Sequence, residues 1–110
     1  MTGEKFIQII TTTAQRADAE KIAEALVEKR LAACVQIIGP IRSIYRWKGN
    51  IEREEEWQCQ IKTRLDLFTE AEQAIRAIHP YETPEIIALP IITGSLNYLE
   101  WLREELTRKV

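Results

Sequence analysis

The chain has 110 residues, of which 15 are basic and 17 are acidic, so its formal net charge is −2. This balance provides no positive excess for a phosphate backbone, and nucleic acid is not expected as a partner. No stretch approaches the ~20 apolar residues of a membrane span, and the first residues lack an apolar signal region. We therefore expect a cytoplasmic protein without membrane partners, folded as a single domain over residues 1–110.

A strand and a helix are predicted first. The run from Phe6 to Thr12 is mostly apolar or β-branched, which favours a strand buried on both faces at the centre of a sheet. After a loop at 13–16, a helix is predicted to extend to about Arg30. Apolar residues recur there at helical spacing, namely Ala19, Ile22, Ala23, Leu26 and Val27.

A long hairpin is predicted from Ala32 to Thr63. Two runs rich in β-branched and aromatic residues flank Lys48-Gly-Asn, interpreted as a three-residue turn with Trp47 opposite Ile51. Each arm could extend for roughly 13 residues, or about 43 Å at 3.3 Å per residue. A compact domain of this length has a radius of gyration near ~13 Å. The distal half of the hairpin should therefore stand in solvent or pack on another copy.

This register makes specific predictions about pairing. It places Arg46 opposite Glu52 and Arg42 opposite Glu56, and it makes Gly39-Pro40 a bulge or bend. It also separates the two cysteines by about five residues, roughly 16 Å along the strand, so no disulfide is expected. Alternation in the second arm directs Trp57, Cys59 and Ile61 to the core, and Glu56, Gln58, Gln60 and Lys62 to a wetter face.

The second half of the chain continues with a helix, a strand and a helix. The first helix is predicted over Leu65–His79, and Pro80 stops it. Its expected buried stripe is Leu65, Phe68, Ala71, Ile75 and Ile78. A strand follows at Glu85–Pro90, where the proline indicates an edge or a strand end. A last helix, capped by Ser95 or Asn97, extends to about Lys109, with Leu96, Leu99, Leu102 and Leu106 as its stripe.

This order predicts an α+β fold of the ferredoxin-like β-α-β-β-α-β kind. Right-handed crossovers and the hairpin arrange such elements as a four-stranded antiparallel sheet with two helices on one face. The final helix is an addition. The open face of the sheet would be wet in a monomer unless it meets that helix or another subunit.

No catalytic residue is expected. RNA binding on this topology needs exposed aromatic residues on the central strands, but the segment 53–61 is too acidic. The loop Thr11–Arg16 contains no glycine for a phosphate and is more simply a strand-to-helix turn. Because His79 is the chain's only histidine and lies beside a proline, no Ser-His-Asp arrangement can be argued.

Metal ligation is an open alternative at His79, Glu82 and Glu85, which are close in sequence. Imidazole and carboxylate groups bind metals where they converge. These three residues lie on a loop, however. The competing interpretation is a histidine at a helix C-terminus whose nitrogens are satisfied by carbonyl groups or solvent.

Five blocks of sequence carry a resemblance to a known family. They are Leu31-Ala-Ala-Cys-Val-Gln-Ile, Ser43-Ile-Tyr-Arg-Trp-Lys-Gly, Ile61-Lys-Thr, His79-Pro-Tyr-Glu-Thr-Pro-Glu-Ile and Tyr98-Leu-Glu-Trp-Leu. In this order and spacing the chain resembles the CutA family of divalent-cation tolerance proteins. The resemblance implies a ferredoxin-like subunit, a homotrimer like the PII signalling proteins, and a link to copper and other divalent metals.

The chain departs from the pattern of family members with proposed copper ligation. Those members have a cysteine at the end of the first strand and a His-His pair before the Pro-Tyr. Here Thr11 and Ile78 occupy two of these positions, and only His79 matches. A threonine hydroxyl is a poor ligand for copper(I), and isoleucine is not a ligand.

The resulting expectation is a non-enzymatic, cytoplasmic trimer that binds a metal ion or a small anion in clefts between subunits. The candidate metal ligands are His79 and Glu85; the candidate cleft residues are Lys62, Tyr81 and Glu82. Lys62 could instead pair with Glu82 or Glu85. Aromatic residues at oligomer contacts suggest Tyr45, Trp47 and Trp57 for the trimer interface, although Tyr45 and Trp47 could instead line a ligand site. The alternative function is a PII-like signalling or scaffold trimer whose effect on metal tolerance is indirect.

Overall fold

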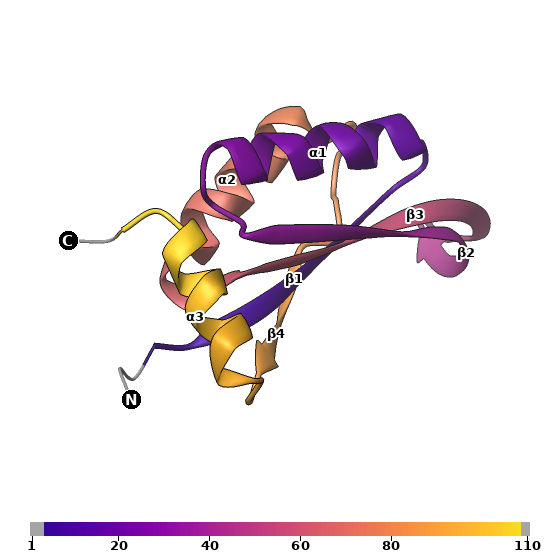
Figure 1. Cartoon of the computed structure of the whole chain (residues 1–110). Helices are drawn as coiled ribbons and strands as arrows, with labels where there is room; N and C mark the ends of the chain where they lie inside the picture. Colours follow the sequence, from indigo (N-terminus) through magenta and orange to yellow (C-terminus); the bar gives the residue numbers. More distant parts are fainter. Residues whose placement is uncertain (1–3, 109–110) are drawn as a thin grey trace.

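The computed structural model describes residues 4–108 as a four-stranded antiparallel sheet with three α-helices (Figure 1). Its elements in chain order are β1 (Phe6–Thr13), α1 (Arg16–Glu28), β2 (Cys34–Trp47), β3 (Asn50–Arg64), the 3₁₀ turn η1 (Leu65–Leu67), α2 (Phe68–Ile78), β4 (Ile87–Ile91) and α3 (Leu96–Glu105). The predicted α+β class is confirmed. The expected end of the last helix at Lys109 lies outside the described residues.

The strands lie in the order β2-β3-β1-β4, and all neighbours are antiparallel. The central position predicted for β1 is confirmed, because β1 pairs with β3 on one side and β4 on the other. β4 is an edge strand, as its proline indicated. Pro90 lies within this strand opposite Ile7, and the strand continues to Ile91.

The main core lies between one face of the sheet and helices α1 and α2 (Figure 1). Its buried residues include Ile7, Ile9, Ala19, Ile22, Leu26, Cys59, Ile61, Ala71 and Ile75. The predicted helical stripes were too wide, because Val27, Leu65 and Ile78 are exposed. The second helix also begins later than predicted, since η1 occupies its expected first turn.

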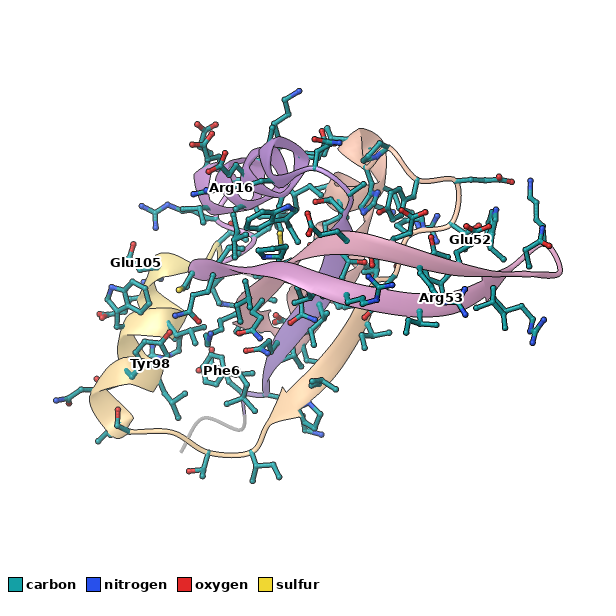
Figure 2. All side chains as sticks on the ribbon, turned by 90° about the vertical axis from the view of Figure 1, so that its right-hand side faces the viewer. Phe6, Arg16, Glu52, Arg53, Tyr98 and Glu105 are labelled. Carbon is teal, nitrogen blue, oxygen red and sulfur yellow. The ribbon has the colours of Figure 1, made fainter. Side chains whose placement is uncertain are left out.

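Helix α3 covers one end of the other sheet face. Leu102 of α3 and Leu106, the residue that follows the helix, pack with Leu67, and Phe6 contacts this cluster. Figure 2 shows Phe6 and Tyr98 in this region. Leu96, predicted to be in the buried stripe, is exposed because it lies at the start of the helix. Beyond α3, this face exposes the apolar side chains of Ile38, Ile87 and Leu89 in the described subunit, and we call this region the open face.

The hairpin differs from the predicted register by one residue. Lys48 and Gly49 have φ values of 50° and 85° and form a two-residue turn, so Trp47 lies opposite Asn50. Two consecutive positive φ values are typical of the type I′ turn, whose twist matches that of the strands. The predicted pairs Arg46–Glu52 and Arg42–Glu56 are therefore wrong.

In the observed register Arg46 faces Ile51, and Arg42 faces Glu55. The predicted bulge at Gly39-Pro40 is confirmed as a register shift between Ile38 and Ile41. Cys59 lies opposite Ile37, three residues along β2 from Cys34. Both described cysteines are unbridged, as predicted.

The described subunit is elongated, with extents of 48 × 25 × 21 Å and a radius of gyration of 14.7 Å. The distal part of the hairpin extends beyond the layer of helices (Figure 1). Glu52 and Arg53, labelled in Figure 2, mark this part. Its exposure within the subunit agrees with the expectation drawn from the length of the arms.

Candidate functional site

A cleft of about 740 Å³ lies between the distal hairpin and the α2–β4 loop, residues 79–86. Four carboxylates line it, those of Glu54, Glu56, Glu82 and Glu85. Three aromatic rings line it as well, those of Tyr45, Trp47 and Tyr81. No lysine or arginine is among the described residues that line it. We call this feature the acidic cleft.

Strand alternation explains the side chains that the hairpin contributes. Successive residues of a strand point to opposite faces, so Glu54 and Glu56 share one face and Glu55 belongs to the other. The register places Tyr45 opposite Glu52, and therefore on the same face as these two glutamates. Trp47, two residues beyond Tyr45, shares this face too.

Tyr81 connects the loop to the strand at the base of the cleft. Its hydroxyl donates a hydrogen bond of 2.6 Å to Oε2 of Glu56. Glu56 lies on the predicted face of β3, opposite to the core residues Cys59 and Ile61, but it is only 5% exposed, so the expectation that it would face water was wrong. Burial, followed by the hydrogen bond and charge of Glu56, raises the pKa of Tyr81. Tyr81 therefore remains a neutral donor.

His79 fastens the same loop to β1. Its Nε2 lies 2.8 Å from the carbonyl oxygen of Thr12, and its Nδ1 accepts a 3.1 Å hydrogen bond from the backbone N–H of Tyr81. This pattern requires the tautomer with the proton on Nε2. Burial lowers the pKa of His79, which favours the neutral ring. The contact with a carbonyl group agrees with the competing interpretation of this histidine, and neither ring nitrogen is left open to a metal within the subunit.

The structure brings only some of the predicted ligands together. Tyr81, Glu82 and Glu85 all line the acidic cleft. Burial, and then the charge of Glu56, raises the pKa of Glu85. Lys62 lies elsewhere, where its Nζ donates a 2.7 Å hydrogen bond to Oε1 of Gln36. Six residues of β3 separate Lys62 from Glu56, or roughly 20 Å, so Lys62 cannot join Tyr81 within one subunit.

The three predicted interface aromatics differ in their surroundings. Trp57 packs against the main core, and the guanidinium of Arg16 lies 5.5 Å from its ring. Tyr45 and Trp47 remain 39% and 37% exposed within the subunit. These two rings, rather than Trp57, are available to a neighbouring molecule or a ligand.

The positions associated with copper in the family do not assemble ligands in this subunit. Thr11 is fully buried opposite Cys59, and its hydroxyl has no hydrogen-bond partner among the residues that the structure describes. Burial raises the pKa of the Cys59 thiol to about 11, so a thiolate is disfavoured there. Ile78 is exposed. Across residues 4–108, no three or more His, Cys, Asp or Glu side chains are grouped closely enough to hold a metal ion.

Sequence reasoning missed Glu54 and Glu56 as residues of the site. The alternation of β3 could have placed them on one face, but the loop that covers Glu56 comes 25 residues later in the chain. Tyr45 and Trp47 were assigned to the trimer interface, with a ligand site as the alternative interpretation. In the structure they also line the acidic cleft.

Comparison with known proteins gives a consistent family assignment. The family model for the CutA1 divalent ion tolerance protein matches residues 7–105. The chain is 45% identical over 96 residues to the divalent-cation tolerance protein CutA of Thermus thermophilus, covering 87% of this chain and 93% of that protein. It is 50% identical over 86 residues to the human protein CutA, covering 78% of this chain and 48% of the human protein.

Solved structures agree with this assignment. The CutA1 structure from Oryza sativa has a TM-score of 0.92 at 35% identity, covering 96% of each chain. The structure from Archaeoglobus fulgidus, described as a periplasmic divalent cation tolerance protein, has a TM-score of 0.88 at 41% identity, covering 91% of this chain and 97% of that one. Within residues 4–108, no helix has the length and apolar character needed to cross a membrane. This chain belongs to the CutA1 divalent ion tolerance protein family.

Proposed function

We propose that the protein is a non-enzymatic divalent-cation tolerance protein. In this proposal it is a cytoplasmic homotrimer of single-domain, ferredoxin-like subunits that binds copper or another divalent cation in clefts between subunits. This proposal rests on the acidic cleft, which four carboxylates line and to which no lysine or arginine of residues 4–108 contributes lining surface. Oxygen ligands of this kind suit hard divalent cations, and their charge disfavours a small anion.

The metal site would need a second subunit to complete it. Within residues 4–108 of one subunit, the carboxylates do not form a group close enough to hold an ion. The cleft opens beside the distal hairpin, which extends beyond the body of the subunit. A neighbouring chain packed on this hairpin could supply further ligands. His79 would then act by positioning the α2–β4 loop, since its nitrogens already have partners.

Exposed apolar side chains on the open face are consistent with the proposed trimer. Ile38, Ile87 and Leu89 leave nearly half of their surface exposed there. Clusters of large apolar side chains on a soluble subunit mark interaction surfaces. Tyr45 and Trp47, 39% and 37% exposed, would meet the neighbouring subunit at the rim of the acidic cleft and keep part of their ring surface open to it.

A PII-like signalling or scaffold trimer is the second candidate. It is favoured by the engaged nitrogens of His79 and by Thr11 and Ile78 at the positions of the family's proposed copper ligands. In this case the protein would affect metal tolerance through a partner, and no metal would bind tightly.

Calorimetric titration of Cu(II) and Zn(II) into chelator-treated protein distinguishes the two candidates. Direct binding predicts a saturable, stoichiometric signal that Glu85→Gln weakens by about tenfold, because a carboxylate ligand is lost. Glu24→Gln, an exposed substitution on α1, is the matched control and should have no effect. No binding at micromolar concentrations would reject direct ligation and favour the scaffold. His79→Ala tests whether this ring contributes.

A further inference from the structure

Aromatic rings form a large part of the acidic cleft. Tyr45 and Trp47 come from β2, and Tyr81 comes from the α2–β4 loop. The faces of such rings attract cations through their quadrupoles, and tryptophan does so most strongly. The same faces offer apolar surface to methyl and methylene groups. A hydrated metal ion makes little use of such surface, whereas an organic cation uses both properties.

Glu56 supplies buried negative charge without a cationic partner. Its carboxylate lines the cleft and is 5% exposed as a residue. Its described hydrogen bond comes from a neutral donor, the hydroxyl of Tyr81. Within residues 4–108, no lysine or arginine forms a salt bridge with Glu56 or with Glu54. Because a buried charge is costly without a counter-charge, a cationic ligand would be stabilised here.

Lys48 shows how an ammonium group is received beside the cleft. Its Nζ lies 5.5 Å from the centroid of the Trp47 ring and 3.9 Å from Oε1 of Glu82. Both of these residues line the cleft. The chain's own ammonium group therefore combines an aromatic face with a carboxylate at the rim. The side chain is largely exposed, so a ligand could compete with it.

The size and spacing of the cleft point to the kind of cation. A volume of about 740 Å³ lies within the range of roughly 300–1,000 Å³ that small-molecule sites occupy. The carboxylates are too dispersed to form a metal-binding group within the subunit. We infer that the acidic cleft binds an organic ammonium ion, with its alkyl groups on Tyr45, Trp47 and Tyr81 and its charge toward Glu54 and Glu56. This inference does not depend on metal binding.

Calorimetry on the native oligomer tests this inference with choline and putrescine as probes. Saturable binding is expected, with one site per chain. The neutral isostere of choline, 3,3-dimethyl-1-butanol, should bind at least about tenfold more weakly because it lacks the charge. Absence of saturable binding by both ammonium probes up to about 10 mM would overturn the inference. Equal binding of the isostere would overturn it too.

Adjacent glutamates on β3 provide a matched pair of variants. Glu54→Gln removes a cleft carboxylate and should weaken choline binding by about tenfold. Glu55→Gln makes the same change on the opposite strand face and should leave binding unchanged. Equal losses in both variants would show non-specific attraction to surface charge and would contradict the site.

Replacing Lys48 should strengthen choline binding, whereas the Glu54 variant should weaken it. Lys48→Met vacates the face of Trp47 and the carboxylate of Glu82, so choline should bind about threefold more tightly. Lys21→Met, at an exposed position of helix α1, is the control and should not change choline binding. Unchanged affinity in Lys48→Met would contradict the assigned position. A Zn(II) titration of the same samples separates the proposals, because metal binding without ammonium binding rejects only this inference.

Discussion

At the scale of single residues, the acidic cleft depends on two attachments of the α2–β4 loop. His79 bonds to the carbonyl of Thr12, and Tyr81 bonds to Glu56. The two attached residues are also linked, since the N–H of Tyr81 donates to Nδ1 of His79. The loop is therefore held against both β1 and β3. Any ligand in the cleft would meet a preformed wall.

Tyr81→Phe should destabilise the protein by about 1–3 kcal/mol, because Glu56 would lose its donor while remaining buried. Urea denaturation followed by circular dichroism measures this change. Tyr45→Phe is the control, since the Tyr45 hydroxyl has no hydrogen bond among the described residues; its change should stay within about 0.5 kcal/mol. Equal stability of Tyr81→Phe and wild type would show that the hydrogen bond contributes nothing.

The stability of the protein should depend on pH through His79. Burial lowers its pKa in the folded state, so the unfolded chain, with a pKa near ~6.5, binds a proton first as the pH falls. The free energy of unfolding should therefore decrease from about pH 6.5 down to the lowered pKa. His79→Gln, which does not titrate, should show a flatter profile in this window.

The raised pKa of Glu85 acts with the opposite sign. The Glu85 carboxyl holds a proton more tightly in the folded state than in the unfolded chain. Glu85 therefore stabilises the fold at low pH, and this stabilisation is lost as the pH rises through the raised pKa. Because wild type and His79→Gln both contain Glu85, subtracting one pH profile of the unfolding free energy from the other removes the contribution of Glu85. Parallel pH profiles for the two proteins would contradict the role assigned to His79.

At the scale of elements, the two strands of the long hairpin pack closely where the Trp57 ring of β3 lies against Gly39 of β2. The register shift between Ile38 and Ile41 lies at this point. A Cβ atom added to Gly39 would lie 2.4 Å from Cε3 of Trp57, which is closer than two non-bonded carbon atoms can approach. The glycine is therefore needed for close packing of β2 against the tryptophan.

Gly39→Ala should destabilise the protein by about 1–3 kcal/mol, because the core must move to accommodate the methyl group. Gly94→Ala is the matched control, since its added Cβ would meet a flexible leucine side chain at 3.2 Å. Chemical denaturation measures both. A smaller loss in Gly39→Ala than in Gly94→Ala would refute this account of the packing at Gly39.

At the scale of the whole molecule, the two sides of the sheet have different environments. Helices α1 and α2 cover one face, whereas α3 covers only one end of the other (Figure 1). In the proposed trimer, the open face and the distal hairpin would contact the neighbouring subunits. Assembly would therefore use surfaces next to the acidic cleft.

Leu89→Lys should shift the oligomer toward smaller species, because a charge would be placed within the proposed interface. Light scattering measures the mass in solution. Val27→Lys is the matched control: Val27 is 44% exposed and Leu89 is 45% exposed, but Val27 lies on helix α1, on the opposite side of the sheet. An unchanged mass for Leu89→Lys would remove the open face from the interface.

The sequence by itself determined the features that arise from local periodicity. The apolar run of β1 predicted its central place, and helical spacing predicted α1 and α3. The β-rich arms predicted a hairpin too long for its own subunit, and Pro90 predicted an edge strand. These signals act within a few residues. Five blocks of sequence also identified the family, which the comparisons show.

Tertiary structure decided the register and the cleft. A turn with two positive φ values shifted the pairing by one residue, and the sequence did not distinguish it from a three-residue turn. Glu56 was expected to face water, but the phenol of Tyr81 buries it from a distant part of the chain. The nitrogens of His79 were likewise engaged by β1 and the loop. Such contacts depend on where separate elements meet, and local patterns do not encode that meeting.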